Sequence, residues 1–230
     1  MSLIASRRNK DALEAIEVLK GLGLLTNELL KNANLEQADL EKTNLEFVNL
    51  QGARLALANL RDTNLYKANL QDADLDLADL TGADLRYTDL QRAWVMGTDF
   101  TAAALNFADM HNTELFGPVT FSRANMIGIN LHGAQMSEVI LIGTKLSEAN
   151  LYEVKLLSQD ELMQAYSLLL TIMPDGSRYD GRYRLAGDIE QAASLDLDLS
   201  DHGNMASYYG VEVETYLNGQ QWADNNLGEK

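Results

Sequence analysis

A large hydrophobic residue stands at every fifth position of the chain from Leu35 to Leu115, in 17 consecutive units. A small or β-branched residue stands two positions before nearly every one of them. A period of five matches neither the 3.6 residues per turn of an α-helix nor the two-residue alternation of a β-strand. Since an α-helix would spread these side chains around its whole circumference, the pattern argues against an amphipathic helix.

One extra residue interrupts the period near Gly117-Pro118. The pattern then continues from Phe121 to Leu156 and adds eight units, which brings the total to 25. Because the later units keep their own spacing, the insertion predicts a local bulge in an otherwise regular structure.

The sequence pattern Ala-Asp/Asn-Leu-X-X, which covers residues 32–157, resembles the pentapeptide-repeat family. This resemblance implies a mainly β fold, the right-handed quadrilateral β-helix, with one pentapeptide on each side and about six coils for 25 units. Packing physics agrees with this expectation, because paired large and small side chains would fill a narrow core while the backbone pairs between coils.

The open ends of a solenoid carry unpaired backbone groups, so we expect helical caps. Residues 10–31 have hydrophobic residues at mostly helical spacing, and this predicts an N-terminal capping helix interrupted at Gly21–Gly23. Ser158 and Glu161 have the spacing of a capping box, which predicts a second capping helix directly after the last repeat.

The rest of the tail contains no pentapeptides. It predicts a turn at Pro174-Asp175-Gly176 and helices over about 189–194 and 203–226, the second broken near Gly210. The stretches TIMPDGS and MASYYGVEVETYLNGQQWA are similar to tails of some cyanobacterial pentapeptide-repeat proteins. The expected domains are an N-terminal tail and capping helix (1–31), the β-helix (32–157), and a C-terminal capping helix with a small helical module (158–230).

The formal net charge of −16 opposes binding to a phosphate backbone over most of the surface. The chain has no cysteine, which excludes disulfides and thiolate metal sites. It has no apolar run of membrane-spanning length and no signal-peptide pattern, so we expect a soluble, cytoplasmic protein without membrane contact.

Catalytic and metal-binding motifs are missing from the sequence, including the P-loop, the nucleophile elbow and the dinucleotide fingerprint. His111 and His132 occupy equivalent positions on successive coils, but a third ligand is not evident. Asp196, Asp198 and Asp201 lack the spacing, glycine and terminal glutamate of an EF-hand. We therefore predict no enzymatic activity, no metal and no cofactor.

Two stripes of hydrophobic side chains fall at outward positions of the repeat, where a monomer rarely exposes such groups. The terminal segments could fold back over one of them, and otherwise we expect a protein-binding face or a homodimer contact. The aromatic stripe comprises Phe47, Tyr66, Tyr87, Phe107 and Ile127. The second patch, on the opposite side, comprises Leu57, Leu77, Trp94, Met96 and Phe116.

Three functions compete at this point. The first is a non-catalytic interaction scaffold or regulator with an unknown protein partner, and the family that the chain resembles includes regulators of differentiation in cyanobacteria. The second is a DNA mimic that binds a type II topoisomerase (gyrase), as acidic members of that family do. However, basic residues interrupt the negative surface here, and phenylalanine centres are few. The third, DNA binding by a helix-turn-helix at Gly210, lacks a basic recognition helix.

Overall fold

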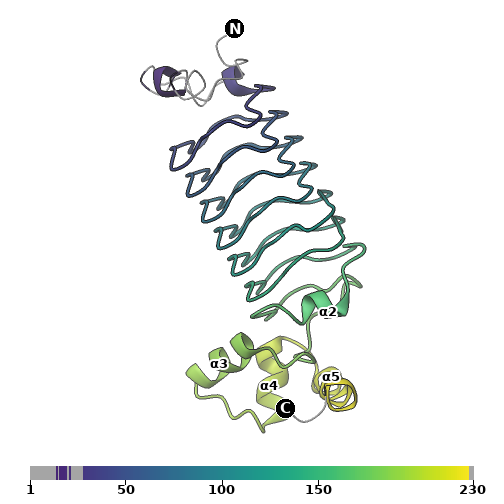
Figure 1. The fold of residues 1–230 in the computed structure, drawn as a ribbon. Coiled ribbons are helices and arrows are strands. Elements are labelled where there is room, and N and C mark those ends of the chain that lie inside the picture. The colour runs from purple at the N-terminus through teal and green to yellow at the C-terminus, as the bar shows by residue number, and fades with distance from the viewer. Residues whose placement is uncertain (1–13, 15, 20, 22–27, 228–230) are drawn as a thin grey trace.

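The computed structural model describes residues 14, 16–19, 21 and 28–227. Figure 1 shows a stack of coils, with the C-terminal helices gathered beyond the end of the last coil. The elements, in chain order, are η1 (Glu28–Leu30), β1 (Glu114–Leu115), β2 (Gln135–Met136), α2 (Gln159–Leu162), α3 (Ala186–Ser194), α4 (His202–Tyr209) and α5 (Val213–Asn226).

Parallel β-bridges join residues that are 20 positions apart and build the solenoid. Along one turn of the chain the bridged pairs are Asn34–Arg54, Asp39–Asn59, Asn44–Asn64 and Asn49–Asn69. The residue directly before each large residue thus pairs with its equivalent on the next coil. The β-helix solenoid that the family resemblance implies is therefore present.

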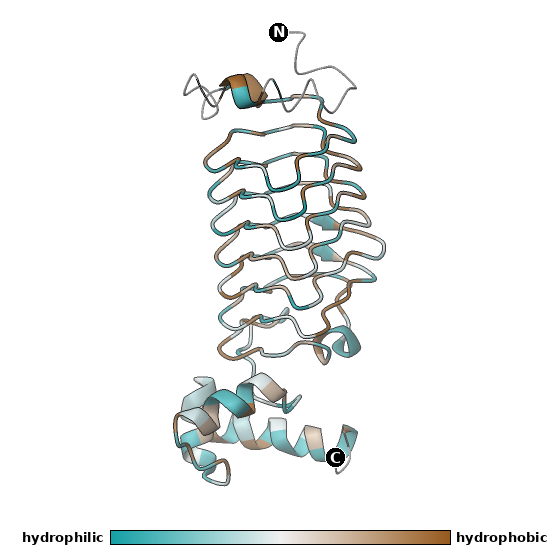
Figure 2. Cartoon of the chain, turned by 60° about the vertical axis from the view of Figure 1, so that its left-hand side comes forward, coloured by the Kyte–Doolittle hydropathy of each residue, from teal (hydrophilic) through white to brown (hydrophobic). Residues whose placement is uncertain are grey.

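The five-residue pattern divides side chains between the core and the surface. The large residues from Leu40 to Leu151 are nearly all fully buried, together with most of the small residues two positions before them. Each buried leucine contributes about 1.5–3 kcal/mol before the entropy cost is subtracted. Figure 2 shows the resulting alternation of hydrophobic and hydrophilic residues along each coil.

Threonines at the small position are buried without an unsatisfied hydroxyl. The Thr63 hydroxyl donates to the Leu40 carbonyl at 2.8 Å, and the Thr88 hydroxyl donates to the Leu65 carbonyl at 2.9 Å. Each bond reaches back to the preceding coil, so a threonine adds a cross-coil hydrogen bond where alanine adds none. This explains why a polar residue can replace alanine inside the core.

The residue two positions after each large residue adopts a left-handed backbone conformation. Its φ is 60° at Phe47, 59° at Leu57 and 65° at Gly52. This conformation lets the chain turn a corner after every pentapeptide, and it is unfavourable for most residues other than glycine, asparagine and aspartate.

The predicted bulge at Gly117-Pro118 is confirmed. Bridged residues are 20 apart up to this point, and the pair Asp99–Thr120 is 21 apart. Gly117 has a φ of +74°, and the Val119 amide donates to the Gly117 carbonyl at 2.6 Å. The extra residue is thus absorbed in one corner, and the register recovers immediately.

The prediction that Leu156 is a core residue was wrong. Its side chain is 63% exposed, and its φ of +67° is typical of the outward corner position. The ladder also continues beyond residue 157, because Ser167 bridges Lys145 and Ile172 bridges Asn150. These pairs are 22 residues apart, since the chain here includes the additional helix α2.

The capping box at α2 is confirmed. The Glu161 amide donates to the Ser158 hydroxyl, and the Ser158 amide donates to the Glu161 carboxylate. The helix is only four residues long, and the chain re-enters the ladder after it. Because α2 is followed by further rungs, it interrupts a coil instead of closing the end of the solenoid.

Gly187 and Asp188 continue the hydrogen-bond pattern at the end of the ladder. The Gly187 amide donates to the Tyr166 carbonyl at 2.9 Å, as a further coil would do. The Asp188 carboxylate accepts from the Leu168 and Leu169 amides at 3.2 Å. Two residues at the start of α3 therefore satisfy backbone groups of the last rung, and we call them the Gly-Asp rung.

The tail forms the predicted turn and helices. Residues 174 and 175 form the turn, and Gly210, with a φ of +67°, ends α4 before α5 begins. Asp201 caps α4 by accepting from the amides of Gly203 and Asn204. In the N-terminal segment expected to be helical, residues 14, 16–19 and 21 are helical, and Ile16 is buried in the core. The remainder of that segment up to residue 27 lies outside the described residues.

Candidate functional site

The aromatic stripe forms a continuous run of rings across successive coils. The ring centroids of Phe47 and Tyr66 are 5.8 Å apart, and those of Tyr66 and Tyr87 are also 5.8 Å apart, both edge to face. Tyr87 and Phe107 are stacked at 5.2 Å. Ile127 extends the row, because its carbonyl accepts from the Phe107 amide. The structure thus brings the four predicted aromatic residues together, and Ile127 lies on the coil next to Phe107.

The stripe is open to solvent along most of its length. Phe47, Tyr87 and Phe107 are each 47–49% exposed, and Tyr66 is half-buried between its neighbours. Helices α3, α4 and α5 lie beyond the end of the coil stack in both whole-chain views (Figures 1 and 2). The C-terminal helices therefore leave the aromatic stripe uncovered.

Gly128 lies directly beside Phe107, the last ring of the aromatic stripe. A Cβ atom at Gly128 would stand 2.5 Å from the Phe107 ring, so a larger residue there would clash with the ring. Phe107 and Gly128 occupy the same corner position of neighbouring coils, since the Gly128 φ is +68° and the Phe107 φ is 57°.

Two cationic side chains, Lys67 and Arg86, lie close to the rings of the aromatic stripe. The Lys67 Nζ lies 5.2 Å from the Tyr66 centroid, 5.7 Å from Tyr87 and 6.0 Å from Phe47. The Arg86 guanidinium lies 5.4 Å from the Tyr66 centroid and pairs with the Asp84 carboxylate. This ion pair lowers the pKa of Asp84, mainly through the hydrogen bond from Arg86.

The second patch is also exposed, but it is less continuous. Leu57, Leu77, Trp94 and Met96 are each 50–61% exposed, and Phe116 is half-buried. The Leu77 side chain lies over Gly97, where a Cβ atom would approach it to 2.7 Å. The patch therefore consists of aliphatic corners beside a single exposed indole, without the stacked rings of the opposite side.

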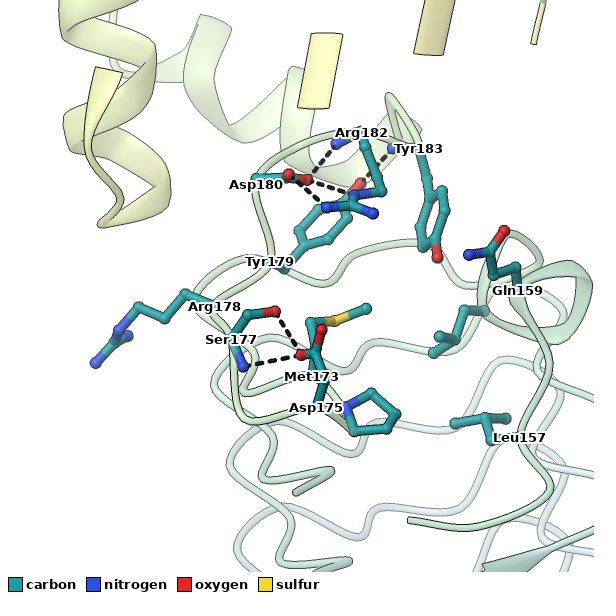
Figure 3. A pocket seen from close by; sticks show the side chains of 12 residues that line it. Leu157, Gln159, Met173, Asp175, Ser177, Arg178, Tyr179, Asp180, Arg182 and Tyr183 are labelled. Atoms are coloured by element: carbon teal, nitrogen blue, oxygen red, sulfur yellow. Dashed lines mark hydrogen bonds and ion pairs between the residues drawn. The ribbon is translucent and has the colours of Figure 1, made fainter. Parts of the chain in front are cut away.

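A cavity of about 180 Å³ lies between the last coils and the loop that leads to α3 (Figure 3). Its floor includes Leu157 and Met173, and its polar wall carries Arg182, which is held by both oxygens of Asp180. The Asp175 carboxylate accepts from the Ser177 amide and hydroxyl. These polar groups of the cavity wall therefore bond to one another.

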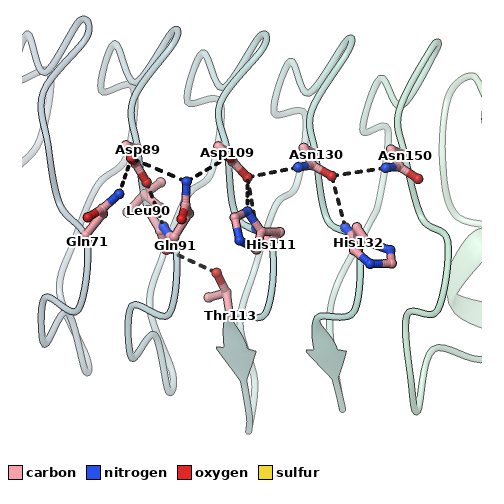
Figure 4. Close-up of polar contacts among 10 residues, drawn as sticks. All are labelled: Gln71, Asp89, Leu90, Gln91, Asp109, His111, Thr113, Asn130, His132 and Asn150. Carbon is pink, nitrogen blue, oxygen red and sulfur yellow. Dashed lines mark hydrogen bonds and ion pairs between the residues drawn. The ribbon is translucent and has the colours of Figure 1, made fainter.

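The two predicted coil-equivalent histidines have different partners, and Figure 4 shows His111 beside Asp109 and His132 beside Asn130. The His111 ring lies 2.9 Å from the Asp109 carboxylate. The His132 ring stacks on Tyr152, and its Nδ1 lies 3.0 Å from the Tyr152 carbonyl. The described part of the chain contains no group of three ligands that could hold a metal ion.

The remaining polar candidates have structural roles. The Asp198 carboxylate accepts from Ser200, and Asp201 caps α4. Gln91 donates to the Asp109 carboxylate of the neighbouring coil at 3.1 Å (Figure 4). Among the described residues, no helix is both long enough and apolar enough to cross a membrane.

Sequence reasoning missed two features near the C-terminal end of the solenoid. Ile142 and Tyr152 are exposed hydrophobic residues, and their outward position follows from the repeat register. The sequence gives no signal for the Gly-Asp rung, because the pentapeptide pattern ends before Gly187 and Asp188. Burial raises the pKa of Asp188 to about 7, and this effect exceeds the opposing effect of the two amide donors.

Comparisons with known proteins agree with the repeat geometry. The family model for pentapeptide repeats, with eight copies, matches residues 29–65, 58–93 and 119–156. No curated protein matches the sequence.

Three solved structures illustrate the similarity. HetL, a pentapeptide repeat protein involved in heterocyst differentiation regulation from the cyanobacterium Nostoc sp. strain PCC 7120, is 30% identical over 64% of this chain and 70% of its own, with a TM-score of 0.35. A pentapeptide repeat protein from the Arabidopsis thaliana thylakoid lumen is 25% identical over 57% and 69%, with a TM-score of 0.29. Full-length QnrB1, a plasmid-mediated fluoroquinolone resistance protein, is 16% identical over 57% and 79%, with a TM-score of 0.36.

Proposed function

Because the chain belongs to the pentapeptide-repeat family, we propose that it is a non-catalytic scaffold that binds a partner protein through the aromatic stripe. The observation that carries this proposal is the unbroken run of rings from Phe47 to Phe107, exposed on a rigid support. Aromatic side chains are enriched in the cores of protein interfaces and provide much of their binding energy.

The backbone under the stripe supports the same conclusion. Phe47, Tyr87 and Phe107 all have a positive φ, a conformation that asparagine or glycine adopts at lower cost. About half of the surface of each of these side chains stays exposed, so they contribute less hydrophobic stabilisation than an aromatic residue in the core. Bulky rings at strained, exposed positions are therefore better explained by a contact with another molecule than by folding.

The test is an affinity capture from native lysate with a stripe variant that carries Phe47→Asn, Tyr87→Asn and Phe107→Asn. Asparagine tolerates the left-handed conformation, so the variant should fold with unchanged thermal stability. We expect at least one abundant partner of the unmodified chain to be lost from the variant. Equal capture by both proteins would rule out the aromatic stripe as the binding face.

The matched control carries Leu57→Asn and Leu77→Asn, which occupy the same corner position on the opposite side with φ values of 59° and 58°. This variant should retain the partner. If it alone loses the partner, the second patch is the binding face. Sedimentation of the purified proteins reports in parallel whether the partner is a second copy of the chain.

A DNA mimic that binds a type II topoisomerase is the second candidate, and the net charge of −16 favours it. Arginines on the solenoid oppose it, because Arg61 pairs with Asp79 and Arg92 pairs with Asp72 across neighbouring coils. Capture of a topoisomerase that persists in the stripe variant would favour this alternative over the scaffold.

We further infer the finer architecture on which the scaffold depends: a right-handed, four-sided rod of about six coils with helical caps at both ends. The buried Ile16 supports the N-terminal cap, and the Gly-Asp rung supports the C-terminal cap. In domain terms the proposal places the cap and tail in 1–31, the pentapeptide repeats in 32–157, and α2 with the helical module in 158–230, where the ladder continues through Ser167 and Ile172. Limited proteolysis should therefore spare a core that extends beyond residue 172, and cleavage at residue 157 would contradict the continued ladder.

A further inference from the structure

We propose that the aromatic stripe receives an amphipathic α-helix of the partner protein, and that an acidic residue of this helix pairs with Lys67. This inference rests on the proposed scaffold function and specifies the chemistry of the partner. Two independent observations support it: the spacing of the rings and the charge at the centre of the stripe.

The ring spacing is closer to the repeat of a helix than to that of a strand. Successive centroids from Phe47 to Phe107 are 5.8, 5.8 and 5.2 Å apart, and because neighbouring rings are offset sideways, their advance along the rod is the coil spacing of about 4.7–4.9 Å. Side chains on one face of an α-helix recur with its pitch of about 5.4 Å. Side chains on one face of a β-strand recur at about 6.6–6.8 Å, and would lose register within a few rings. A helix lying along the rod therefore places one hydrophobic residue beside each ring.

The length of the stripe defines the size of the docking segment. Four rings are separated by three steps, which correspond to about three helical turns, or roughly 11 residues. Hydrophobic residues at positions i, i+4, i+7 and i+11 of such a helix would meet the four rings. Peptide recognition by a groove or surface commonly uses this spacing of anchor residues.

The charge at the centre of the stripe selects an acidic residue. Lys67 forms no ion pair with any residue that the structure describes, and its Nζ lies within 6.0 Å of three ring centroids. Arg86 is already neutralised by Asp84. A chain of net charge −16 thus presents an unpaired cation at the middle of its aromatic surface. A carboxylate of the partner would be attracted there, whereas a lysine would be repelled.

The same charge argues against a second copy as the occupant. Two copies of the chain would each carry a net charge of −16 and would repel each other. If their aromatic stripes packed together, the Lys67 of one copy would also lie opposite the Lys67 of the other. A heterologous helix with one or two carboxylates among its apolar residues avoids both repulsions.

The experiment measures fluorescence anisotropy of labelled synthetic peptides with the full-length protein. The probe is a 15-residue alanine-based helix with leucines at i, i+4, i+7 and i+11 and a glutamate next to the central leucines. Its first control replaces the glutamate with lysine, and its second carries two prolines that abolish the helix. We expect the glutamate peptide to bind at least tenfold more tightly than either control, and its margin over the lysine peptide to decrease with added salt.

Variants of the protein assign the effect to the stripe. Lys67→Gln should reduce the preference for glutamate over lysine to less than threefold. The matched control Lys42→Gln occupies the same corner position elsewhere, where it pairs with Glu41, and should leave the preference unchanged. Neither substitution removes an aromatic ring, so binding driven by the rings alone would persist in both variants.

The outcomes separate this inference from the proposed function. If no helical peptide binds, or if the proline peptide binds equally well, the helix inference is wrong. When the stripe variant still loses a captured partner in that case, the scaffold proposal stands with a partner of another shape. If the stripe variant loses no partner and no peptide binds, both proposals fail.

Discussion

The Gly-Asp rung leads to a quantitative prediction for Asp188→Ala. The substitution removes the acceptor of two buried amides, those of Leu168 and Leu169. A buried donor without an acceptor costs about 1–3 kcal/mol, so the two amides together cost roughly 2–6 kcal/mol. Part of this cost is offset, because the substitution also removes the unfavourable burial of the carboxylate. We expect the free energy of unfolding to decrease by about 3 kcal/mol.

The assay follows the C-terminal module by tryptophan fluorescence during urea unfolding. The chain has two tryptophans, and Trp94→Phe leaves Trp222 as the only one. Trp222 packs edge to face on Tyr183 at 5.5 Å, so its emission should report the loss of this contact. An unchanged unfolding midpoint in the Asp188→Ala protein would refute the role of Asp188 in closing the ladder.

The same residue predicts the pH dependence of stability. Burial raises the pKa of Asp188 to about 7, against the opposing hydrogen bonds from the Leu168 and Leu169 amides. Burial, together with the nearby Asp188 charge, also raises the pKa of Tyr179, Tyr208 and Tyr209. The folded state therefore holds a proton that the unfolded state, with a pKa of 3.8, releases. The stabilisation is complete below pH 3.8 and is lost as the pH rises towards 7, by about 1.4 kcal/mol per pH unit.

The control for this pH dependence is Asp188→Asn, which keeps an acceptor oxygen and does not titrate. Asp72 and Asp84 have a lowered pKa in the folded state, so the stability that they contribute changes only as the pH falls below their pKa in the unfolded state. They therefore do not affect the comparison between pH 5 and pH 7. Between pH 5 and pH 7 the unmodified protein should lose stability, and Asp188→Asn should not. Parallel curves for the two proteins would contradict the assignment.

Three further predictions test the ladder. Gly187→Ala should lower the free energy of unfolding by about 1–3 kcal/mol, because its Cβ would stand 2.6 Å from the Tyr166 carbonyl oxygen; chemical denaturation measures this. Thr88→Val should cost about 1 kcal/mol in the same assay, since it removes the hydroxyl that donates to Leu65. Leu156→Asn should change the melting temperature little, because this exposed corner tolerates asparagine; a large decrease would show that Leu156 packs in the core after all.

The sequence predicts the solenoid well because one local rule repeats. Each large residue selects an inward position, and hydrogen bonds between coils enforce the 20-residue register, so an error in one unit does not propagate. The bulge at Gly117 was predictable for the same reason, since the period on both sides defines its position. Where the repeat ends, the rule ends too, and Leu156 was assigned to the core by extrapolation.

The aromatic stripe was predictable from the same register, whereas its detailed geometry was not. The period places Phe47 and Tyr87 at outward positions of one side, and the structure confirms this. In the unit centred on Leu65, Lys67 occupies the corner position that Phe47, Tyr87 and Phe107 occupy in the other units. The ring of this unit belongs to Tyr66, one residue earlier, and the Lys67 ammonium lies near it. A period alone cannot reveal that this exchange places a cation among three rings.

The negative charge of the chain is distributed in a way that bears on its partners. The solenoid carries several arginines whose carboxylate partners lie on the neighbouring coil, as in Arg54–Glu36 and Arg92–Asp72. Such exposed pairs contribute little to stability, but they cancel much of the field that a DNA mimic would need. The tail, residues 158–230, has 13 acidic against 4 basic residues and holds much of the excess. The rod can therefore present Lys67 to an acidic helix, while helices α3, α4 and α5 of the acidic tail lie beyond its far end.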